Sequence, residues 1–139
     1  MIDNQTLTEN FERHSFDIGT LFLFENYVIA EMNEGVVLTF DSFFELGRKL
    51  VEKYNERPFG YIVHRKNSYS INPTDIHIFN KAFPNLKAFA VVSYSSMGEK
   101  IFTLENKFFN FNRQLFHDLK TAERWVQTTL KANSDVNLV

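Results

Sequence analysis

The chain has 139 residues, a formal net charge of −2 and no cysteine. This charge balance lacks the excess of basic side chains that holds a phosphate backbone, so nucleic-acid binding is not expected. The absence of cysteine excludes disulfides, thiolate catalysis, iron–sulfur clusters and cysteine-based zinc sites.

The composition predicts one domain over residues 1–139, with an ordered core over about 10–131 and frayed ends near 1–8 and 132–139. Hydrophobic residues make up 44% of the chain, which is enough to bury a sizeable core. Neither a signal peptide nor an apolar run near the ~20 residues of a membrane-spanning helix is found. We therefore expect a cytoplasmic protein without a transmembrane segment.

Three short strands are predicted in the first third of the chain. Residues 10–17, 20–25 and 27–33 are rich in β-forming side chains, and turn-forming residues separate them. Glu34-Gly35 ends the third strand. Because short turns join these segments, we expect an antiparallel meander.

From Ser42 the apolar period changes to that of a helix. Apolar or small residues recur at positions 43, 46, 47, 50, 51 and 54, which places one stripe along a helix face. Asp41 and Ser42 are the candidate N-caps, and Ser42 with Glu45 matches a capping box. The next expected elements are a strand over 59–65, a loop over 67–73 and a second helix over 74–83.

Residues 86–94 are nearly continuous in apolar side chains, which is typical of a central strand covered on both faces. A third helix is predicted after Ser95-Ser96, with an apolar stripe of Met97, Ile101, Leu104 and Phe108. A short strand over 113–117 and a final helix capped by Asp118 complete the chain. The order predicts an α/β fold, in which a mixed β-sheet has an antiparallel N-terminal meander followed by βαβ units, with about four helices.

Several local segments, taken with that layout, carry a resemblance to a known family. They are Glu34-Gly35-Val36, Tyr61-Ile62-Val63, Lys87-Ala88-Phe89-Ala90-Val91-Val92, Ser95-Ser96-Met97-Gly98, and Leu115-Phe116 with Ala122-Glu123-Arg124-Trp125-Val126. The pattern, which covers about residues 20–131, resembles the SpoIIAA-like branch of the STAS superfamily. It is similar in particular to small stand-alone STAS-like domains of Bacteroidetes-type bacteria.

The resemblance implies a domain that docks to other proteins, as anti-sigma-factor antagonists do, or that binds a small or lipid-like ligand. STAS antagonists carry an Asp-Ser-Ser-Gly-type phosphorylation motif at the end of a strand before a helix. The corresponding stretch here, residues 65–73, has Ser68 and Ser70 without that motif. These two serines are the candidate phosphorylation sites.

The carboxyl ends of the predicted parallel strands form the candidate binding site, because ligands of open α/β sheets settle outside these ends. Basic, hydroxyl and aromatic side chains there suit an anionic ligand or an acidic segment of a partner. The candidate residues are His64, Arg65, Ser68, Tyr69, Ser70, Tyr94, Ser95 and Ser96. Ser95 or Ser96 is expected to cap the third helix; the alternative is that this helix start holds an anion.

Signatures of metal binding and catalysis are missing. The spacing of His14, His64, His77 and His117 matches no metal motif, and neither a metal nor another cofactor is expected. The G-x-S-x-G elbow of serine hydrolases is not found, so the protein is not expected to be an enzyme. The enzymatic alternative requires His64 within about 3 Å of a serine hydroxyl.

The chain holds 16 phenylalanines, more than one core layer accommodates. Two helical layers on the sheet would bury them; the alternative is an exposed patch for self-association, lipid or partner docking. We expect a non-enzymatic bacterial domain that regulates a protein partner by contact. The alternatives are a carrier or sensor of a small apolar or lipid-like molecule in a Phe-lined cavity, and a homodimer.

Overall fold

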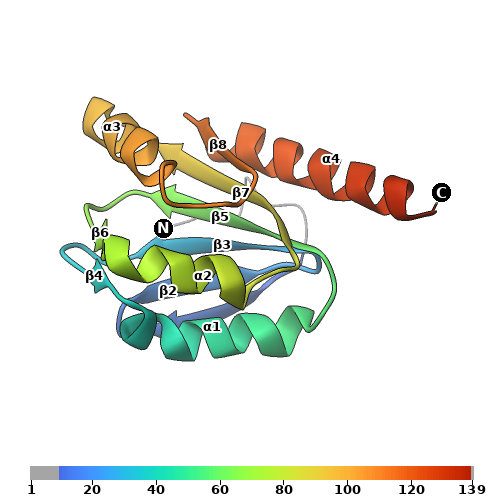
Figure 1. Cartoon of the computed structure of the whole chain (residues 1–139), viewed down its shortest axis with the longest axis horizontal. Helices are drawn as coiled ribbons and strands as arrows, with labels where there is room; N and C mark the ends of the chain where they lie inside the picture. Colours follow the sequence, from blue (N-terminus) through green and yellow to red (C-terminus); the bar gives the residue numbers. More distant parts are fainter. Residues whose placement is uncertain (1–9, 139) are drawn as a thin grey trace.

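The secondary structure follows the change of apolar period along the chain (Figure 1). The computed structural model describes residues 10–138. The elements are β1 (Glu12–Phe16), β2 (Gly19–Leu23), β3 (Tyr27–Met32), β4 (Val37–Leu38), α1 (Phe40–Tyr54), β5 (Phe59–Arg65), β6 (Ser70–Ile71), the 3-10 turn η2 (Pro73–Asp75), α2 (Ile76–Ala82), β7 (Leu86–Ser93), α3 (Ser96–Glu105), β8 (Arg113–Phe116) and α4 (Leu119–Leu138). The second helix, expected over 74–83, is divided between η2 and α2.

One mixed sheet of six strands, in the order β1-β2-β3-β5-β7-β8, organises the fold. β1, β2 and β3 are antiparallel neighbours, whereas β3, β5, β7 and β8 run parallel. Parallel neighbours need a crossover connection, and α1, α2 and α3 provide the three that are required. The α/β class with an antiparallel N-terminal meander and βαβ units is confirmed.

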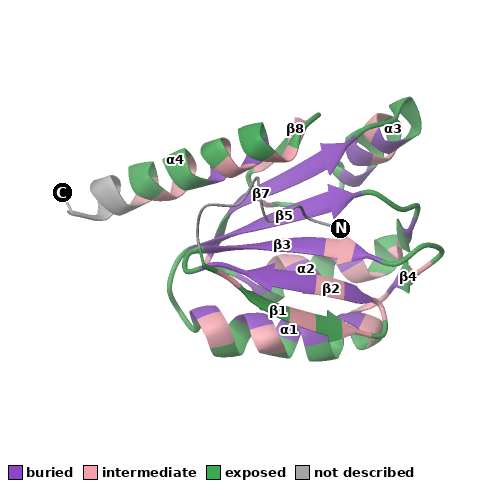
Figure 2. Cartoon of the chain, turned by 180° about the vertical axis from the view of Figure 1, so that it is seen from behind, coloured by how far each residue is buried: buried purple, intermediate pink, exposed green. Residues whose placement is uncertain are grey.

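Helices cover both faces of the sheet, and each face has its own apolar cluster (Figures 1 and 2). On one face Leu50 of α1 and Phe79 of α2 belong to the cluster that contains Val63. On the other face Val126 of α4 belongs to the cluster that contains Ile62. Ile62 and Val63 are neighbours in β5 and point to opposite faces, as strand geometry requires. β7 is buried along almost its whole length, which confirms the expected central strand.

The phenylalanines are divided between these two clusters. All of them lie in the described part of the chain, and only Phe44 and Phe108 are exposed. Ring pairs such as Phe43 and Phe79, with centroids 5.1 Å apart and planes at 90°, have the edge-to-face geometry that aromatic rings favour. Two helical layers therefore bury most of the phenylalanines, as expected.

α1 begins earlier than its apolar pattern predicts. Thr39, and neither Asp41 nor Ser42, is the N-cap: its Oγ1 accepts a hydrogen bond from the Ser42 amide at 3.0 Å. The Thr39 amide donates in return to Ser42 Oγ at 2.8 Å. Ser42 thus takes the third helical position of the capping box, which the sequence pattern assigned to Glu45.

β4 and β6 lie where the sequence pattern predicts loops. They pair in parallel, Val37 with Ser70 and Leu38 with Ile71. The turn before β4 is made by Gly35, whose φ of 78° favours glycine. Strands of two residues are too short to show a period, so tertiary pairing alone defines them.

α3 forms where it is expected but is rotated about its axis. The apolar pattern predicts that Met97, Leu104 and Phe108 face the core, yet these side chains are 63%, 57% and 46% exposed. α3 buries Phe102 and Glu105 instead. A carboxylate thus occupies a position on the buried side of this helix.

The C-terminal helix α4 begins at the expected residue but extends further than expected. Asp118 caps α4 as expected, because its Oδ1 accepts a hydrogen bond from the Thr121 amide at 2.8 Å. This bond lowers the pKa of Asp118. α4 continues past the expected end of the core at residue 131 to Leu138. The expected frayed segment 1–8 lies outside the described residues.

Gly60 sets how closely α4 approaches the sheet, and this predicts a steric effect. A Cβ at this position would overlap Cγ1 of Val126 and would lie 3.3 Å from Cβ of Tyr27. We expect Gly60→Ala to lower the free energy of unfolding, measured with urea, by about 1–3 kcal/mol through overpacking. Because Val126→Ala makes room, the double variant should lose less than the sum of the two single losses. Additive losses would contradict this prediction.

Candidate functional site

The carboxyl ends of the parallel strands lie together at one edge of the sheet, at the left of Figure 1. β3 leads into β4, β5 into β6 and β7 into α3 at this edge. The site residues expected from sequence follow these connections in chain order: His64 and Arg65 end β5, Ser68 and Tyr69 precede β6, Ser70 begins β6, Tyr94 and Ser95 follow β7, and Ser96 begins α3. The topology therefore gathers them on one side of the molecule.

The sheet separates these residues into two groups. His64 and Arg65 are neighbours at the end of β5, so their side chains point to opposite faces. His64 contacts Tyr94, whereas the guanidinium of Arg65 lies over the ring of Tyr69 with Cζ 4.3 Å from the centroid. His64, Arg65 and Tyr69 are buried, and Tyr94 is exposed.

A chain of hydrogen bonds joins Glu31, His64 and Tyr94 on the face that α4 covers. His64 Nδ1 lies 2.9 Å from Glu31 Oε2, and His64 Nε2 lies 2.7 Å from the Tyr94 hydroxyl. An ionised carboxylate only accepts, so Nδ1 donates to Glu31, and in the neutral form of the ring Nε2 accepts the Tyr94 O–H. Burial, together with the charges of Asp118 and Glu31, raises the pKa of Tyr94, which stays protonated at neutral pH.

The enzymatic alternative requires a serine hydroxyl beside His64. The hydroxyl found there belongs to Tyr94 instead. A phenol with a raised pKa is a weak nucleophile, so the chain of hydrogen bonds is better suited to fixing the ring of Tyr94. Sequence reasoning missed Glu31. The available signal was a single carboxylate in an otherwise apolar strand whose parallel register places it beside His64.

On the opposite face, Glu105 of α3 lies between two arginines from different strands. Its Oε1 is 3.1 Å from Nη2 of Arg113 and 3.7 Å from Nη1 of Arg65. All three side chains are more than nine-tenths buried. The guanidinium of Arg113 also lies over the rings of Phe89, Phe102 and Phe109, with Cζ 4.3–4.8 Å from their centroids. We refer to Arg65, Glu105 and Arg113 as the ion cluster.

The ion cluster carries a net charge of +1 in a buried place. Arg65 Nη1 and Arg113 Nε have no hydrogen-bond acceptor within the part of the chain that the structure describes. Burial lowers the pKa of Arg113, and the adjacent Glu105 opposes this shift. Turning α3 so that Glu105 reached solvent would leave both cations buried without a counter-charge, which holds the helix in its observed rotation.

The four serines expected in the site, Ser68, Ser70, Ser95 and Ser96, are exposed. Ser95 is the N-cap of α3, since its Oγ accepts a hydrogen bond from the amide three residues later at 3.0 Å, and Ser96 begins the helix. The Ser68 amide donates to Glu34 Oε2 at 2.8 Å. Ser68 precedes β6 and Ser70 is its first residue, so neither lies at a direct strand-to-helix junction.

α3 presents an apolar stripe to solvent. Met97 and Leu104 are exposed along it, Ile101 between them is half-buried, and Phe108 is exposed in the turn that follows the helix. We call these four residues the α3 face. Their spacing of i, i+4, i+7 and i+11 is that of a helix which lies in an apolar groove. Tyr94, 59% exposed, directly precedes the helix cap.

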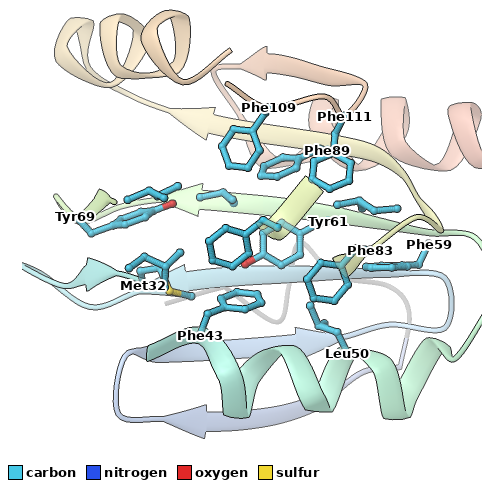
Figure 3. A pocket seen from close by; sticks show the side chains of 15 residues that line it. Met32, Phe43, Leu50, Phe59, Tyr61, Tyr69, Phe83, Phe89, Phe109 and Phe111 are labelled. Atoms are coloured by element: carbon cyan, nitrogen blue, oxygen red, sulfur yellow. The ribbon is translucent and has the colours of Figure 1, made fainter. Parts of the chain in front are cut away.

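A cavity of about 50 Å³ lies between the sheet and helices α1 and α2 (Figure 3). Tyr61 and Tyr69 contribute its two hydroxyl groups, and the other lining side chains are apolar. The phenylalanines that line it are Phe43, Phe59, Phe79, Phe83, Phe89, Phe109 and Phe111. The Phe-lined cavity that the carrier alternative requires is therefore present.

No group of three or more histidine, aspartate or glutamate side chains in residues 10–138 is arranged to hold a metal ion. His14 and His117 instead pair with single carboxylates, each at 3.5 Å, on Glu12 and Glu99. No helix in that part of the chain is both long enough and apolar enough to cross a membrane.

The ion cluster predicts a large stability effect at one carboxylate. Glu105→Gln removes the charge between two buried arginines, and we expect it to lower the free energy of unfolding by about 3–5 kcal/mol. Glu45→Gln is the matched control, because Glu45 pairs with Arg48 at 2.9 Å on the surface. There the loss should stay below about 1 kcal/mol. Urea unfolding of both variants provides the comparison, and equal losses would contradict a structural role of the cluster.

Comparison with known proteins shows a likeness of fold. No protein-family model and no curated protein sequence matches the chain. The solved structure of an uncharacterized protein of the DUF3478 family, with a SpoIIAA-like fold, from Shewanella loihica PV-4 matches with a TM-score of 0.54. The match covers 84% of this chain and 92% of that protein at 11% sequence identity. The chain therefore has a SpoIIAA-like fold, as the pattern of its sequence predicts.

Proposed function

We propose that this protein is a non-enzymatic, regulatory docking module of the bacterial cytoplasm that binds a protein partner through the α3 face and Tyr94. The observation that supports the proposal is the exposure of Met97 and Leu104 on α3 and of Phe108 in the turn after it, while buried charges hold the other side of the helix. Contiguous exposed apolar residues commonly mark interaction sites.

The charges around the α3 face favour one kind of partner. Lys100 in α3 and Lys107 just after it are exposed, and neither forms an ion pair within the described residues. A partner groove with an apolar floor and carboxylates along its border would match both the stripe and the lysines. A second copy of this chain fits less well, because a two-fold contact would bring the same lysines to both sides.

Two other site residues expected from sequence, His64 and Arg65, support the docking surface by holding its side chains in place. His64 holds the ring of Tyr94 in one orientation, which lowers the entropy that a partner must remove on binding. Tyrosines of this kind are common among the residues that dominate binding energy. Arg65 is buried, and its role is to hold Glu105 and thereby α3.

Ser68 and Ser70 supply the regulatory part of the proposal. Both are exposed, so a kinase has access to them. A phosphate on Ser68 would lie near the Glu34 carboxylate, which accepts a hydrogen bond from the Ser68 amide. Repulsion between the two anions would open the connection between β5 and β6 and alter this edge of the sheet.

A second function, the binding of a small molecule, is favoured by the Phe-lined cavity. Its open space of about 50 Å³ exceeds the ~10–15 Å³ that one water molecule requires. Apolar cavities with a few polar groups are the usual form of small-molecule sites. This function and partner docking use different side chains and do not exclude each other.

Site-specific photo-crosslinking tests the docking proposal. A photoreactive residue at Leu104 should give one discrete adduct with another protein in the native host, whereas the same residue at Val51 of α1, 53% exposed, should give none. Lys100→Glu with Lys107→Glu should lower the yield at Leu104 several-fold, because the charges then repel the acidic border of the groove. Circular dichroism provides the folding control, since surface changes alter stability by only about 0.5 kcal/mol.

Other crosslinking outcomes would overturn the docking proposal. Equal adducts at both positions would show unspecific contact. An adduct with the mass of two chains would assign the α3 face to self-association. If the crosslinking yield does not change when both lysines are replaced by glutamate, the partner groove is not bordered by carboxylates.

A further inference from the structure

Two tyrosine hydroxyl groups line the apolar cavity without partners. Tyr61 and Tyr69 are 7% and 8% exposed, and neither hydroxyl forms a hydrogen bond within the described residues. Figure 3 shows both oxygens, in red, among the side chains that line the cavity. Neither oxygen is fully enclosed by protein atoms, so each can form a hydrogen bond with a small molecule in the cavity.

Both hydroxyl groups keep their protons and can donate. Burial raises the pKa of Tyr69 to about 12, an increase that Arg65 only partly opposes. Burial raises the pKa of Tyr61 as well, and the neighbouring Tyr69 adds to this shift. At neutral pH each residue therefore offers an O–H to an acceptor atom.

The net charge of the groups next to Tyr69 is positive. Arg65, Glu105 and Arg113 are the charged groups that act on the Tyr69 hydroxyl, and they sum to +1. Arg65 Nη1 lacks a hydrogen-bond acceptor, and its guanidinium lies against the ring of Tyr69. Two donors beside an uncompensated cation favour an anionic acceptor over a neutral one.

The size and lining of the cavity limit the rest of the ligand. Apart from the two tyrosine hydroxyls, the lining consists of aliphatic, methionine and aromatic groups, which suit an alkyl chain. The open space of about 50 Å³ is a third of the ~150 Å³ of a cavity that binds benzene, so a long lipid tail does not fit.

We propose that the cavity binds a short-chain monocarboxylate, with the carboxylate at the hydroxyl groups of Tyr61 and Tyr69 and the alkyl chain against the phenylalanine rings. This assignment rests on the small-molecule function proposed above and adds the chemical class of its ligand.

Nuclear magnetic resonance titration with two matched probes tests the proposal. Sodium butanoate and 1-butanol have the same carbon chain and differ in the carboxylate. We expect butanoate to bind more tightly, with nuclear Overhauser effects between its methyl group and the ring protons of Phe89 and Phe109. Tyr61→Phe should raise the dissociation constant of butanoate about tenfold or more, because a hydrogen bond to a charged group is lost.

A second tyrosine provides the control variant. The hydroxyl of Tyr54 is also buried but lies outside the cavity lining, where it donates to the Phe24 and Tyr27 carbonyls at 2.8 and 2.6 Å. Tyr54→Phe should lower the midpoint of urea unfolding and leave butanoate binding unchanged. Tyr61→Phe should leave that midpoint unchanged or raise it, since its hydroxyl has no partner to lose.

The remaining outcomes separate the ligand class from the function. Equal dissociation constants for butanol and butanoate would overturn the carboxylate class, and so would a dissociation constant of butanoate that Tyr61→Phe leaves unchanged. In both cases the proposed small-molecule function would still be supported. Affinity for butanoate that falls as the pH rises from 6 to 8 would show that the neutral acid binds, which also overturns the class. If neither probe shows contacts with the cavity rings at millimolar concentration, both the class and the small-molecule function are wrong.

Discussion

The buried contact of Glu105 with Arg65 and Arg113 decides which side of α3 faces the sheet. Two neighbouring stripes of this helix compete for burial, and the stripe that contains Met97 and Leu104 is the more apolar. Burying one such side chain is worth about 1.5–3 kcal/mol, but turning the helix would expose Phe102 and forfeit a similar amount. The turn would also leave two buried arginines without a carboxylate, at a cost of about 3–5 kcal/mol for a single broken pair. The charges therefore outweigh the small difference in apolar area.

The same cluster borders both sites that we propose. Phe108 points outward as part of the α3 face, while the next residue, Phe109, lines the cavity and lies against Arg113. Arg65 holds Glu105 on one side and lies over Tyr69, another lining residue, on the other. One set of buried charges thus orients the exposed helix face and places a net positive charge beside Tyr69 in the lining of the cavity.

The sequence predicted those elements whose signals are local. β5 was expected over 59–65 and has those bounds, and Asp118 caps α4 as its position before an apolar period indicated. The continuous apolar run of β7 correctly indicated a central strand with two covered faces. These features depend on period, burial and capping chemistry within a few residues, which the sequence states directly.

The features that the sequence left open depend on residues that meet only in the folded chain. β4 and β6 are defined by pairing across more than thirty positions. The rotation of α3 depends on the contacts of Glu105 with Arg65 of β5 and Arg113 of β8, two strands that the sequence pattern does not connect with this helix. The expected site residues share one edge, but His64 and Arg65 lie on opposite faces of it, since alternation along β5 outweighs closeness in sequence. Glu31 and Tyr61 were missed because a lone polar group in a buried strand has no local signature of its partner or of a cavity.

Thiol accessibility tests the central claim about α3 most directly, since the chain has no cysteine of its own. Single-cysteine variants Leu104→Cys and Phe102→Cys report on the two sides of the helix, with Val51→Cys as an exposed reference. The account predicts that the cysteine at 104 reacts with a thiol reagent as fast as the reference, and that the cysteine at 102 reacts far more slowly. A protected cysteine at 104 with a reactive one at 102 would show that the apolar stripe is the buried side and would contradict the account.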